Sequence, residues 1–192
     1  MAHIFLSQLK TALNNCIDEL EQIHFLFSRN PETDFTRKRK LTFKEYIQFM
    51  LQMQGKAVSN EILDFFGHSL SAPSKSAFTQ QRYKLLPEGW DFLFHSFVTQ
   101  CRSLTDNLYC GYRLLSCDGS DANIARNPSD ERTFIHEGEK GYNAVHINAL
   151  YDIINNVYCD FHVQGKKKLH ECAALNLIVD RYSDPVPSIL MA

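Results

Sequence analysis

The spacing of apolar residues changes once along this chain, after residue 108, and that change limits the folds open to it. Before this point apolar side chains recur every three or four positions, which is the repeat of amphipathic helices. Beyond it, apolar and polar residues alternate over 145–151 and again over 157–163, as they do in half-buried strands. The sequence therefore predicts an α+β protein, with an all-helical N-terminal region, 1–108, followed by a mixed sheet in 109–192.

The composition is that of an ordinary globular protein and excludes several classes. The chain has 192 residues, of which 44% are hydrophobic and 22% are charged, and its formal net charge is -2. This charge excludes a globally basic, histone-like protein, so contacts with nucleic acid have to come from local cationic patches. No apolar run approaches the ~20 residues of a membrane span. The six cysteines are scattered and lack the close pairs of zinc or redox motifs, so we expect reduced thiols in a cytoplasmic protein without membrane contact.

Four adjacent cations stand in the polar segment that follows the first predicted helix. That helix is expected to begin near Leu6 and to stop near Asn30, because Pro31 lacks the amide that the next turn needs. A charged run of this length is typical of a solvated surface, but it also binds a phosphate backbone through counterion release. The four cations are Arg37, Lys38, Arg39 and Lys40.

Residues 59–86 predict a helix-turn-helix segment. The first helix, 61–66, is short, a break follows over 67–73, and Ser74 can cap a second helix that runs to Leu86. Such a second helix can enter a major groove, where glutamines meet base edges and cations meet phosphates. The alternative is two ordinary packed helices with a polar outer face. On the second helix Gln81 is expected to project outward, and the residues predicted to contact DNA are Lys75, Gln81, Arg82 and Lys84.

The second region predicts the order strand, strand, strand, helix, strand. A buried strand over 112–118 ends on Asp118, and two antiparallel strands follow a long polar connection, 121–141. A helix over 169–182 then leads to an apolar run, 188–192, that suits a buried parallel strand. Because such crossovers are right-handed, the last strand is expected to lie near the first and parallel to it. The crossover helix is expected to be buried through Ala173, Ala174, Leu177 and Ile178.

Asp118 allows two interpretations. The triplet Asp118-Gly119-Ser120 is by itself a common turn signal. Gly119 has no Cβ, however, and would also let a backbone, a metal ion or a ligand come close to the carboxylate. In the predicted sheet, carboxylates at the C-terminal ends of the two parallel strands would converge on one point of the surface, which favours a functional role for Asp118.

Several segments, taken in order, carry a resemblance to a known family. They are 114–120, 146–152, 171–180 and 189–192, with 76–78 and Arg82 upstream. Together they resemble insertion-sequence transposases of the DDE class, in the group related to insertion sequence four, whose catalytic domain has the RNase H-like fold. The similarity covers most of the chain, and it implies a partial RNase H-like mixed sheet (β-β-β-α-β) as a truncated catalytic domain in 109–192.

By this resemblance Asp118 is the first acidic residue of the catalytic triad and a metal ligand. The second residue of the triad follows the fourth strand and the third is a glutamate much further on, and neither has a counterpart in the 192 residues. Asp180, Asp184 and Glu171 are not expected to replace them, because they precede the last strand or begin the helix. Cleavage by water and strand transfer by a 3' hydroxyl need two ions, Mg²⁺ or Mn²⁺, which one aspartate cannot hold.

The resemblance implies a transposase that acts on transposon-end DNA by phosphodiester cleavage and strand transfer. We expect this chain to be an N-terminal fragment, with an aspartate encoded just beyond Ala192, and to be inactive in cleavage by itself. Its partners would be double-stranded DNA, as terminal inverted repeats and as target, and a second copy in a homodimer of the synaptic complex. The location would be the bacterial cytosol, in association with the nucleoid.

Two other functions remain open on the sequence. A non-catalytic DNA-binding or regulatory module that competes for transposon ends would bind DNA in a salt-sensitive way through the cations, with no dependence on Asp118. A structural protein whose basic patches are merely solvated would not bind DNA even at low salt. DNA binding and its dependence on Asp118 therefore separate the three functions.

Overall fold

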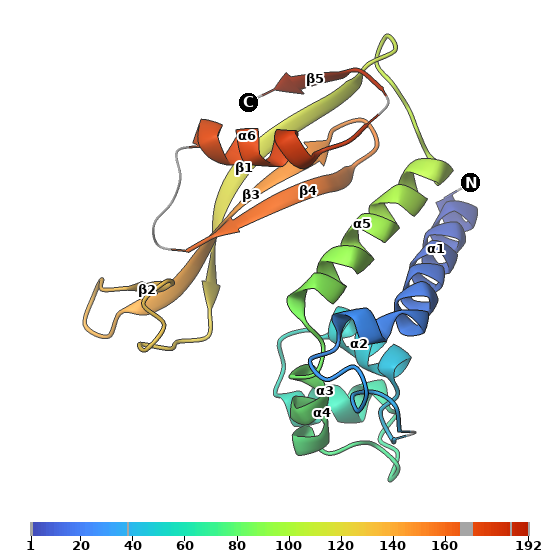
Figure 1. Ribbon diagram of the computed structural model, residues 1–192, viewed down its shortest axis with the longest axis vertical. Helices are drawn as coiled ribbons and strands as arrows, with labels where there is room; N and C mark the ends of the chain where they lie inside the picture. Colours follow the sequence, from blue (N-terminus) through green and yellow to red (C-terminus); the bar gives the residue numbers. More distant parts are fainter. Residues whose placement is uncertain (1, 38, 166–170, 185, 192) are drawn as a thin grey trace. The chain divides into compact units, whose positions relative to one another are not determined.

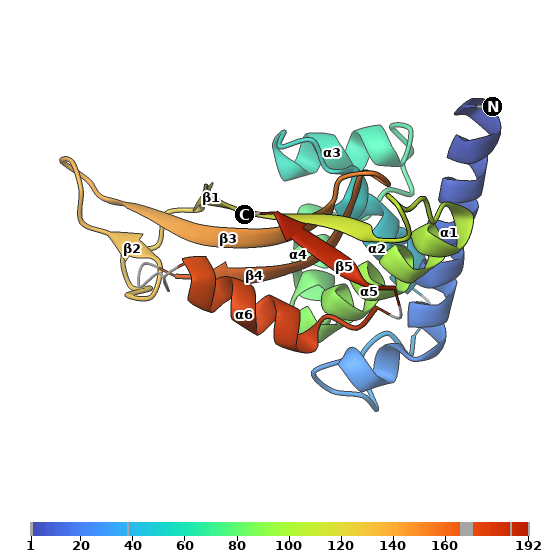
Figure 2. The same cartoon turned by 90° about the horizontal axis from the view of Figure 1, so that it is seen from above.

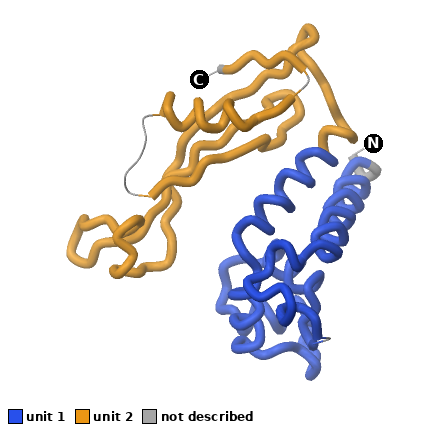
Figure 3. Tube along the Cα trace, in the orientation of Figure 1, with its two compact units in different colours: residues 1–100 blue, residues 101–192 orange. Residues whose placement is uncertain are grey.

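The chain folds into two compact units, residues 1–100 and residues 101–192 (Figure 3). The computed structural model describes every residue except 1, 38, 166–170, 185 and 192. The division between the units lies inside helix α5 (Pro87–Leu104), upstream of the change in apolar spacing after residue 108. None of the helices in the described part of the chain is both long enough and apolar enough to cross a membrane.

The first unit is entirely helical, as the apolar spacing predicts. Its elements surround one apolar core, whose centre is formed by Tyr46, Phe49 and Phe78, each 2% exposed or less. Rings of this size bury about 150–250 Å² each and dominate the stability of a small core. The elements are α1 (Ala2–Gln22), the 3-10 helix η1 (His24–Phe27), α2 (Phe43–Gln52), α3 (Val58–Phe65), α4 (Lys75–Arg82) and α5 (Figure 1).

Two of these helices begin at polar caps that are evident in the sequence. At the start of α2 the Glu45 amide donates to the Thr42 hydroxyl (3.2 Å), and the Thr42 amide donates to the Glu45 carboxylate (2.9 Å). This reciprocal pair satisfies two of the amides that a helix start leaves without partners. At the start of α4 the Ser74 hydroxyl accepts from the Ala77 amide (3.2 Å), which confirms Ser74 as the predicted cap.

The predicted C-terminal ends of two helices were wrong. We expected the first helix to reach Asn30, but α1 ends at Gln22, and the helix expected to run to Leu86 ends at Arg82. The reason is tertiary, because the segments that follow the two helices pair with each other. The Arg29 amide donates to the Lys84 carbonyl (2.9 Å), and the Leu86 amide donates to the Phe27 carbonyl (2.8 Å). Each segment thereby finds hydrogen-bond partners outside its own helix.

The second unit contains a mixed five-stranded sheet and one long helix, so the α+β class with N-terminal helices is confirmed. Strand β3 pairs antiparallel with β1 along one edge and with β4 and the short β2 along the other. Strand β5 continues the sheet beyond β1 and runs parallel to it, as expected for the strand that follows the crossover helix. The elements are β1 (Arg113–Ile124), β2 (Phe134–Ile135), β3 (Tyr142–Asp152), β4 (Val157–Gln164), α6 (Glu171–Arg181) and β5 (Ser188–Met191) (Figure 1).

The strand that carries Asp118 does not end there, contrary to the prediction. It continues for six residues to Ile124, because β3 is long enough to pair with it as far as Asn143. The segment 121–141, which was expected to be a polar connection, therefore supplies the end of β1 and, further on, the strand β2. Asp118 lies in the middle of a paired strand, opposite Ala149, so the turn interpretation is wrong as well.

Helix α6 lies against one face of the sheet, where Ile178 packs on Leu115, Leu150 and Cys159 (Figures 1 and 2). Two of the four residues expected to be buried in this helix are exposed. Ala174 and Ile178 are fully buried, whereas Ala173 is exposed and Leu177 is 46% exposed. The helix meets the sheet along one narrow stripe of residues four positions apart, and neighbours outside that stripe face away from the core.

The last strand is not the buried strand that its apolar sequence suggested. Among the described residues β5 pairs with β1 alone, so it lies at an end of the sheet. Ile189 and Leu190 are 41% and 40% exposed. The apolar run predicted the parallel pairing correctly, but the position of the strand at the sheet edge leaves its side chains half uncovered.

Candidate functional site

Asp118 lies in a hollow on the face of the sheet opposite α6. Successive side chains of a strand point to opposite faces, so Leu115 and Cys117 face α6 while Ser116 and Asp118 face away from it. The carboxylate is exposed, and its Oδ1 accepts the amide of the next residue, Gly119, at 2.8 Å. The hollow has a volume of about 410 Å³ and is lined by Ser116, Asp118, Ser120, Ala149, Tyr151, Asn156 and Tyr158.

Gly119 gives space to side chains of the neighbouring strand rather than to a ligand. A Cβ at this position would stand 2.7 Å from Nε2 of His146 and 3.0 Å from Oδ1 of Asn148, both on β3. His146 in turn shares a hydrogen bond of 2.7 Å between its Nδ1 and Oδ1 of Asp121. The absence of a side chain at Gly119 therefore lets two polar groups of β3 lie against β1 on the face of α6.

Three other carboxylates in or near these strands are held by arginines. The buried carboxylate of Asp160 accepts two hydrogen bonds from Arg181, at 2.6 and 2.7 Å. Asp152 and Asp184 are both bound by Arg113. Asp118 differs from all three, because it has no ion-pair partner among the described residues. Its exposed carboxylate is therefore accessible to a ligand.

The residues around Asp118 do not fit a site for two divalent ions. Hard cations such as Mg²⁺ are held by several carboxylate oxygens, and a two-ion site needs more than one carboxylate. Asp118 is the one carboxylate that lines this hollow, but it also lines a smaller hollow at the start of α6, where Glu171 is a second carboxylate. Within the described part of the chain, no group of three or more histidines, cysteines, aspartates or glutamates is placed to hold a metal ion. Asp118 and Glu171 can each supply one ligand, and the described residues do not complete a site for two ions.

A second, smaller hollow of about 180 Å³ lies between the sheet and the start of α6, and it is lined both by Asp118 and by Glu171, which stands in the first turn of the helix. Cys117 lines it, and the pKa of its thiol is raised by burial and further by the negative charges of Asp118 and Glu171. A raised pKa keeps the thiol protonated near neutral pH, which makes it a poor nucleophile. Cys117 is therefore a packing residue of this face, not a reactive group.

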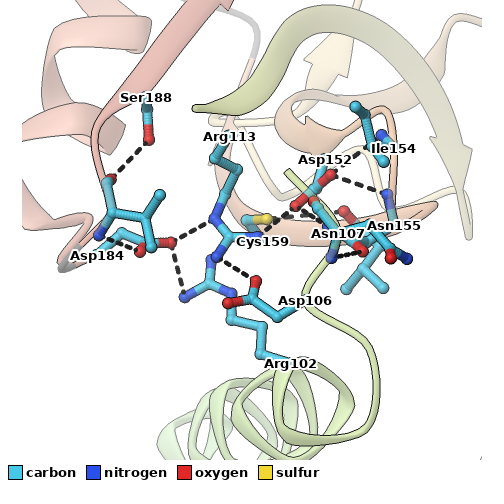
Figure 4. Close-up of polar contacts among 12 residues, drawn as sticks. Arg102, Asp106, Asn107, Arg113, Asp152, Ile154, Asn155, Cys159, Asp184 and Ser188 are labelled. Carbon is cyan, nitrogen blue, oxygen red and sulfur yellow. Dashed lines mark hydrogen bonds and ion pairs between the residues drawn. The ribbon is translucent and has the colours of Figure 1, made fainter. Parts of the chain in front are cut away.

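Arg113 is a central residue of the sheet unit that the sequence interpretation missed. Its guanidinium is 2% exposed and donates to Asp184 from Nε (2.6 Å), to Asp152 from Nη1 (2.8 Å) and to Asp106 from Nη2 (2.6 Å) (Figure 4). These bonds fasten the start of β1 to the end of β3 and to the segment before β5. The available signal was a lone arginine at the start of an apolar strand, since a charge buried there requires partners.

In this cluster the pKa of the arginine is raised and the pKa values of two aspartates are lowered, as expected when opposite charges are paired. Burial by itself would lower the pKa of Arg113, but its three hydrogen-bonded carboxylates raise it above the usual value. Burial would raise the pKa of Asp152, but hydrogen bonds from Asn155 and Arg113 lower it. The pKa of Asp184 is lowered in the same way, by Val186, Tyr182 and Arg113 against the effect of burial. Arg113, Asp152 and Asp184 therefore stay charged near neutral pH.

In the helical unit, cations from two distant segments surround one hollow of about 530 Å³. Arg39 and Lys40 come from the linker before α2, and Lys84 comes from the segment after α4. The Lys84 amine lies 3.8 Å from the carboxylate of Asp34 and 5.5 Å above the ring of Phe35, so part of its charge is already balanced. The lining residues are Arg39, Lys40, Leu41, Ala72, Pro73, Ser74, Ala77, Gln80, Gln81 and Lys84.

The remaining residues predicted to contact DNA are placed in different ways. Arg37 is exposed but does not line the hollow, and Lys38 lies outside the described residues. Lys75 and Arg82 are exposed on α4, also outside the hollow. The structure therefore brings together four of the predicted residues, Arg39, Lys40, Gln81 and Lys84.

Gln81 does not project outward, which corrects the prediction for α4. It is 5% exposed, because it follows Phe78 by three positions and shares the inner face of the helix with that core residue. Its Oε1 has no hydrogen-bond partner among the described residues. Gln81 thus lines the inner wall of the hollow. A base in the major groove of a duplex would not reach it.

Comparison with known protein families, curated proteins and solved structures finds no match to this chain.

Proposed function

We propose that the protein acts in DNA transposition as a DDE-class transposase chain. Its helical unit would bind double-stranded DNA, and its sheet unit would be an RNase H-like core that carries Asp118 as the first acidic residue. The observation that supports this best is the order of the sheet. Two antiparallel strands lie on one side of β1, a helix follows them, and β5 lies parallel to β1 on the other side, with Asp118 on β1 itself. This is the arrangement that the sequence resemblance implies.

The cations around the hollow of the helical unit support the DNA-binding part of the proposal. Arg39 and Lys40 are exposed and next to the start of α4, which is an eight-residue helix with exposed Lys75 and Arg82. A helix start carries a partial positive charge, so the cations and the amide groups of this surface both attract phosphate. The net charge of the whole chain is -2, and this local surface is what would let it approach a polyanion.

A direct test is the salt dependence of binding to a blunt DNA duplex, measured by fluorescence anisotropy. The logarithm of the binding constant falls with the logarithm of salt concentration by about 0.9 for each phosphate neutralised. We expect the variant with Arg39→Ala and Lys40→Ala to reduce that slope by about 2. Lys10→Ala removes an exposed cation of α1 and serves as the matched control, with an unchanged slope. Absence of duplex binding by the wild-type chain at low salt would overturn the proposal.

A second candidate function is a non-catalytic module that binds transposon ends without cutting them. The observation that favours it is the scarcity of carboxylates beside Asp118, because Glu171 is the one other carboxylate among the described residues that line its two hollows. Nicking of supercoiled plasmid in Mg²⁺ or Mn²⁺ separates the two functions. Nicking that Asp118→Asn abolishes, with DNA binding retained, would establish a catalytic role and exclude the module. DNA binding without nicking, equal in the wild type and in Asp118→Asn, would favour the module.

A further inference from the structure

Gln81 combines deep burial with an unsatisfied polar atom. Its side chain is 5% exposed in α4, and its Oε1 accepts no hydrogen bond from the described residues. A buried acceptor without a donor destabilises a fold, and an apolar side chain of similar size would avoid that loss. Its neighbours on the inner face of the unit, Phe78 and Leu85, are apolar. The glutamine is therefore better explained by a ligand than by the packing of the unit.

The surroundings of Gln81 have the form of a ligand site. The hollow that it lines has a volume of about 530 Å³, within the range of roughly 300–1,000 Å³ that is usual for small-molecule sites. Arg39 and Lys40 stand at its exposed side, and Ser74 marks the start of α4 beside it. The Ser74 hydroxyl is occupied by the Ala77 amide at 3.2 Å, but the helix start retains its partial positive charge. The open side of the hollow attracts an anion, while its inner wall offers an amide.

A nucleotide has groups that suit both the cations at the open side of the hollow and the amide of Gln81 at its inner wall. Its phosphate can be bound by the guanidinium and the amine at the open side, as point charges and as hydrogen-bond donors. Its base has an edge with donors and acceptors, and a glutamine amide pairs with such an edge through two hydrogen bonds. A half turn about the last side-chain bond of Gln81 exchanges its oxygen and nitrogen, so the amide can match a base in either sense. The unpaired oxygen then acquires a donor from the base.

The burial of Gln81 decides which form of nucleotide can bind. A base that remains stacked and paired presents its edges only in a groove, and a side chain with 5% exposure does not reach into a groove. A nucleotide that has left the stack can enter a hollow and present its whole edge. We propose that the hollow around Gln81 binds one unpaired nucleotide, with its phosphate on Arg39 and Lys40 and its base edge on Gln81. The inference rests on the proposed DNA-binding function, although a free nucleotide has the same chemistry.

The test compares three probes on the full chain by fluorescence anisotropy and competition. They are a blunt DNA duplex, the same duplex with one bulged 2-aminopurine nucleotide, and free deoxyadenosine monophosphate. We expect the wild-type chain to bind the bulged duplex about tenfold more tightly than the blunt one, which lies within the roughly 5- to 150-fold discrimination of a bidentate amide–base pair. We also expect Gln81→Leu to abolish that preference and to leave the affinity for the blunt duplex unchanged. Gln52→Leu, an exposed glutamine of α2 outside the hollow, is the control and should keep the preference.

The outcomes separate this inference from the proposed function. Equal affinity of the wild type for the two duplexes, or a preference that survives Gln81→Leu, would overturn the nucleotide site while leaving DNA binding intact. Binding of the free monophosphate that is lost in Gln81→Leu, without binding of either duplex, would support the site and overturn the DNA function. If none of the three probes binds, both proposals fail.

Discussion

The two units bury one polar side chain each in very different ways. Arg113 of the sheet unit is 2% exposed and meets three carboxylates, whereas Gln81 of the helical unit is 5% exposed and its Oε1 meets no donor among the described residues. A buried charge is tolerated when partners satisfy it, and its loss then leaves those partners unsatisfied. A buried amide without a partner costs stability instead. The comparison separates a polar group that holds the fold together from one that the fold does not need.

The largest effect is expected from replacement of Arg113, the buried group whose charge is paired. Arg113→Met leaves Asp152 buried without a cation and leaves Asp184 with the more distant Arg102 at 3.6 Å. Loss of one partner of a buried ion pair typically costs about 3–5 kcal/mol. We therefore expect the sheet unit to lose most of its stability. Native-state hydrogen exchange of the amides of β1 and β3 in the full chain measures this loss directly. Arg39→Met, which removes an exposed cation of the linker, should change the same amides by less than about 0.5 kcal/mol. A loss below about 1 kcal/mol in Arg113→Met would contradict the role of the network.

The second-largest effect is expected to be a loss of stability of the sheet unit at acidic pH. The pKa values of Asp152 and Asp184 are lowered in the folded protein, by Asn155 and Arg113 for the first and by Val186, Tyr182 and Arg113 for the second. A lowered pKa contributes stability above the unfolded pKa of about 3.9, and that contribution is lost as pH falls through the folded value. We expect strand amides to keep their protection from pH 7 to about pH 4 and to lose it below.

Arg113 provides the control for this pH dependence. Without the cation, Asn155 still donates to Asp152, and Val186 and Tyr182 still donate to Asp184, so the pKa of each carboxyl should be lowered less than in the wild type. Arg113→Met is therefore expected to lose less stability than the wild type as the pH falls below about 4. Parallel pH profiles of the two proteins would show that the network does not control the acid response.

The smallest effect is expected from replacement of Gln81, whose Oε1 is unsatisfied. This replacement should raise the stability of its unit instead of lowering it. Gln81→Leu removes an acceptor without a partner, so the free energy of unfolding of the helical unit should rise by about 1 kcal/mol. The fluorescence of Trp90, the single tryptophan of the chain, reports this unit because the indole packs on its core 6.2 Å from the ring of Tyr46. Gln52→Leu is the exposed control and should stay within about 0.5 kcal/mol. A loss of stability in Gln81→Leu would mean that the amide is satisfied within the fold.

Much of the fold could be predicted from local patterns in the sequence. The alternation over 157–163 predicted β4, and the capping residue Ser74 predicted where α4 begins. Each of these signals depends on residues within one turn or one strand, so it does not require knowledge of distant contacts. The parallel pairing of β5 with β1 was also predicted, because a helical crossover leaves little choice of direction.

The errors occurred where a distant segment determined the outcome. The strand of Asp118 extends to Ile124 because β3 offers partners that far, and α1 stops at Gln22 because the chain that follows it pairs with the segment after α4. Gln81 was expected outside because it is polar, but its spacing of three from Phe78 places it on the inner face. The polarity of Gln81 by itself does not reveal this burial. The sequence contains no signal of a partner for the amide, because the structure provides none at this position.

The candidate sites show the same division between sequence and structure. The sequence determined by itself that Asp118 belongs to a strand region and that cations gather at 37–40, because composition and spacing are local properties. Only the tertiary structure decided that Asp118 stands exposed and apart from Asp152 and Asp184, whose charges Arg113 takes up, and that Arg39 and Lys40 share a hollow with Gln81. The physical reason is that ion pairing and burial depend on which groups the fold brings within a few ångströms, and these groups are far apart along the chain.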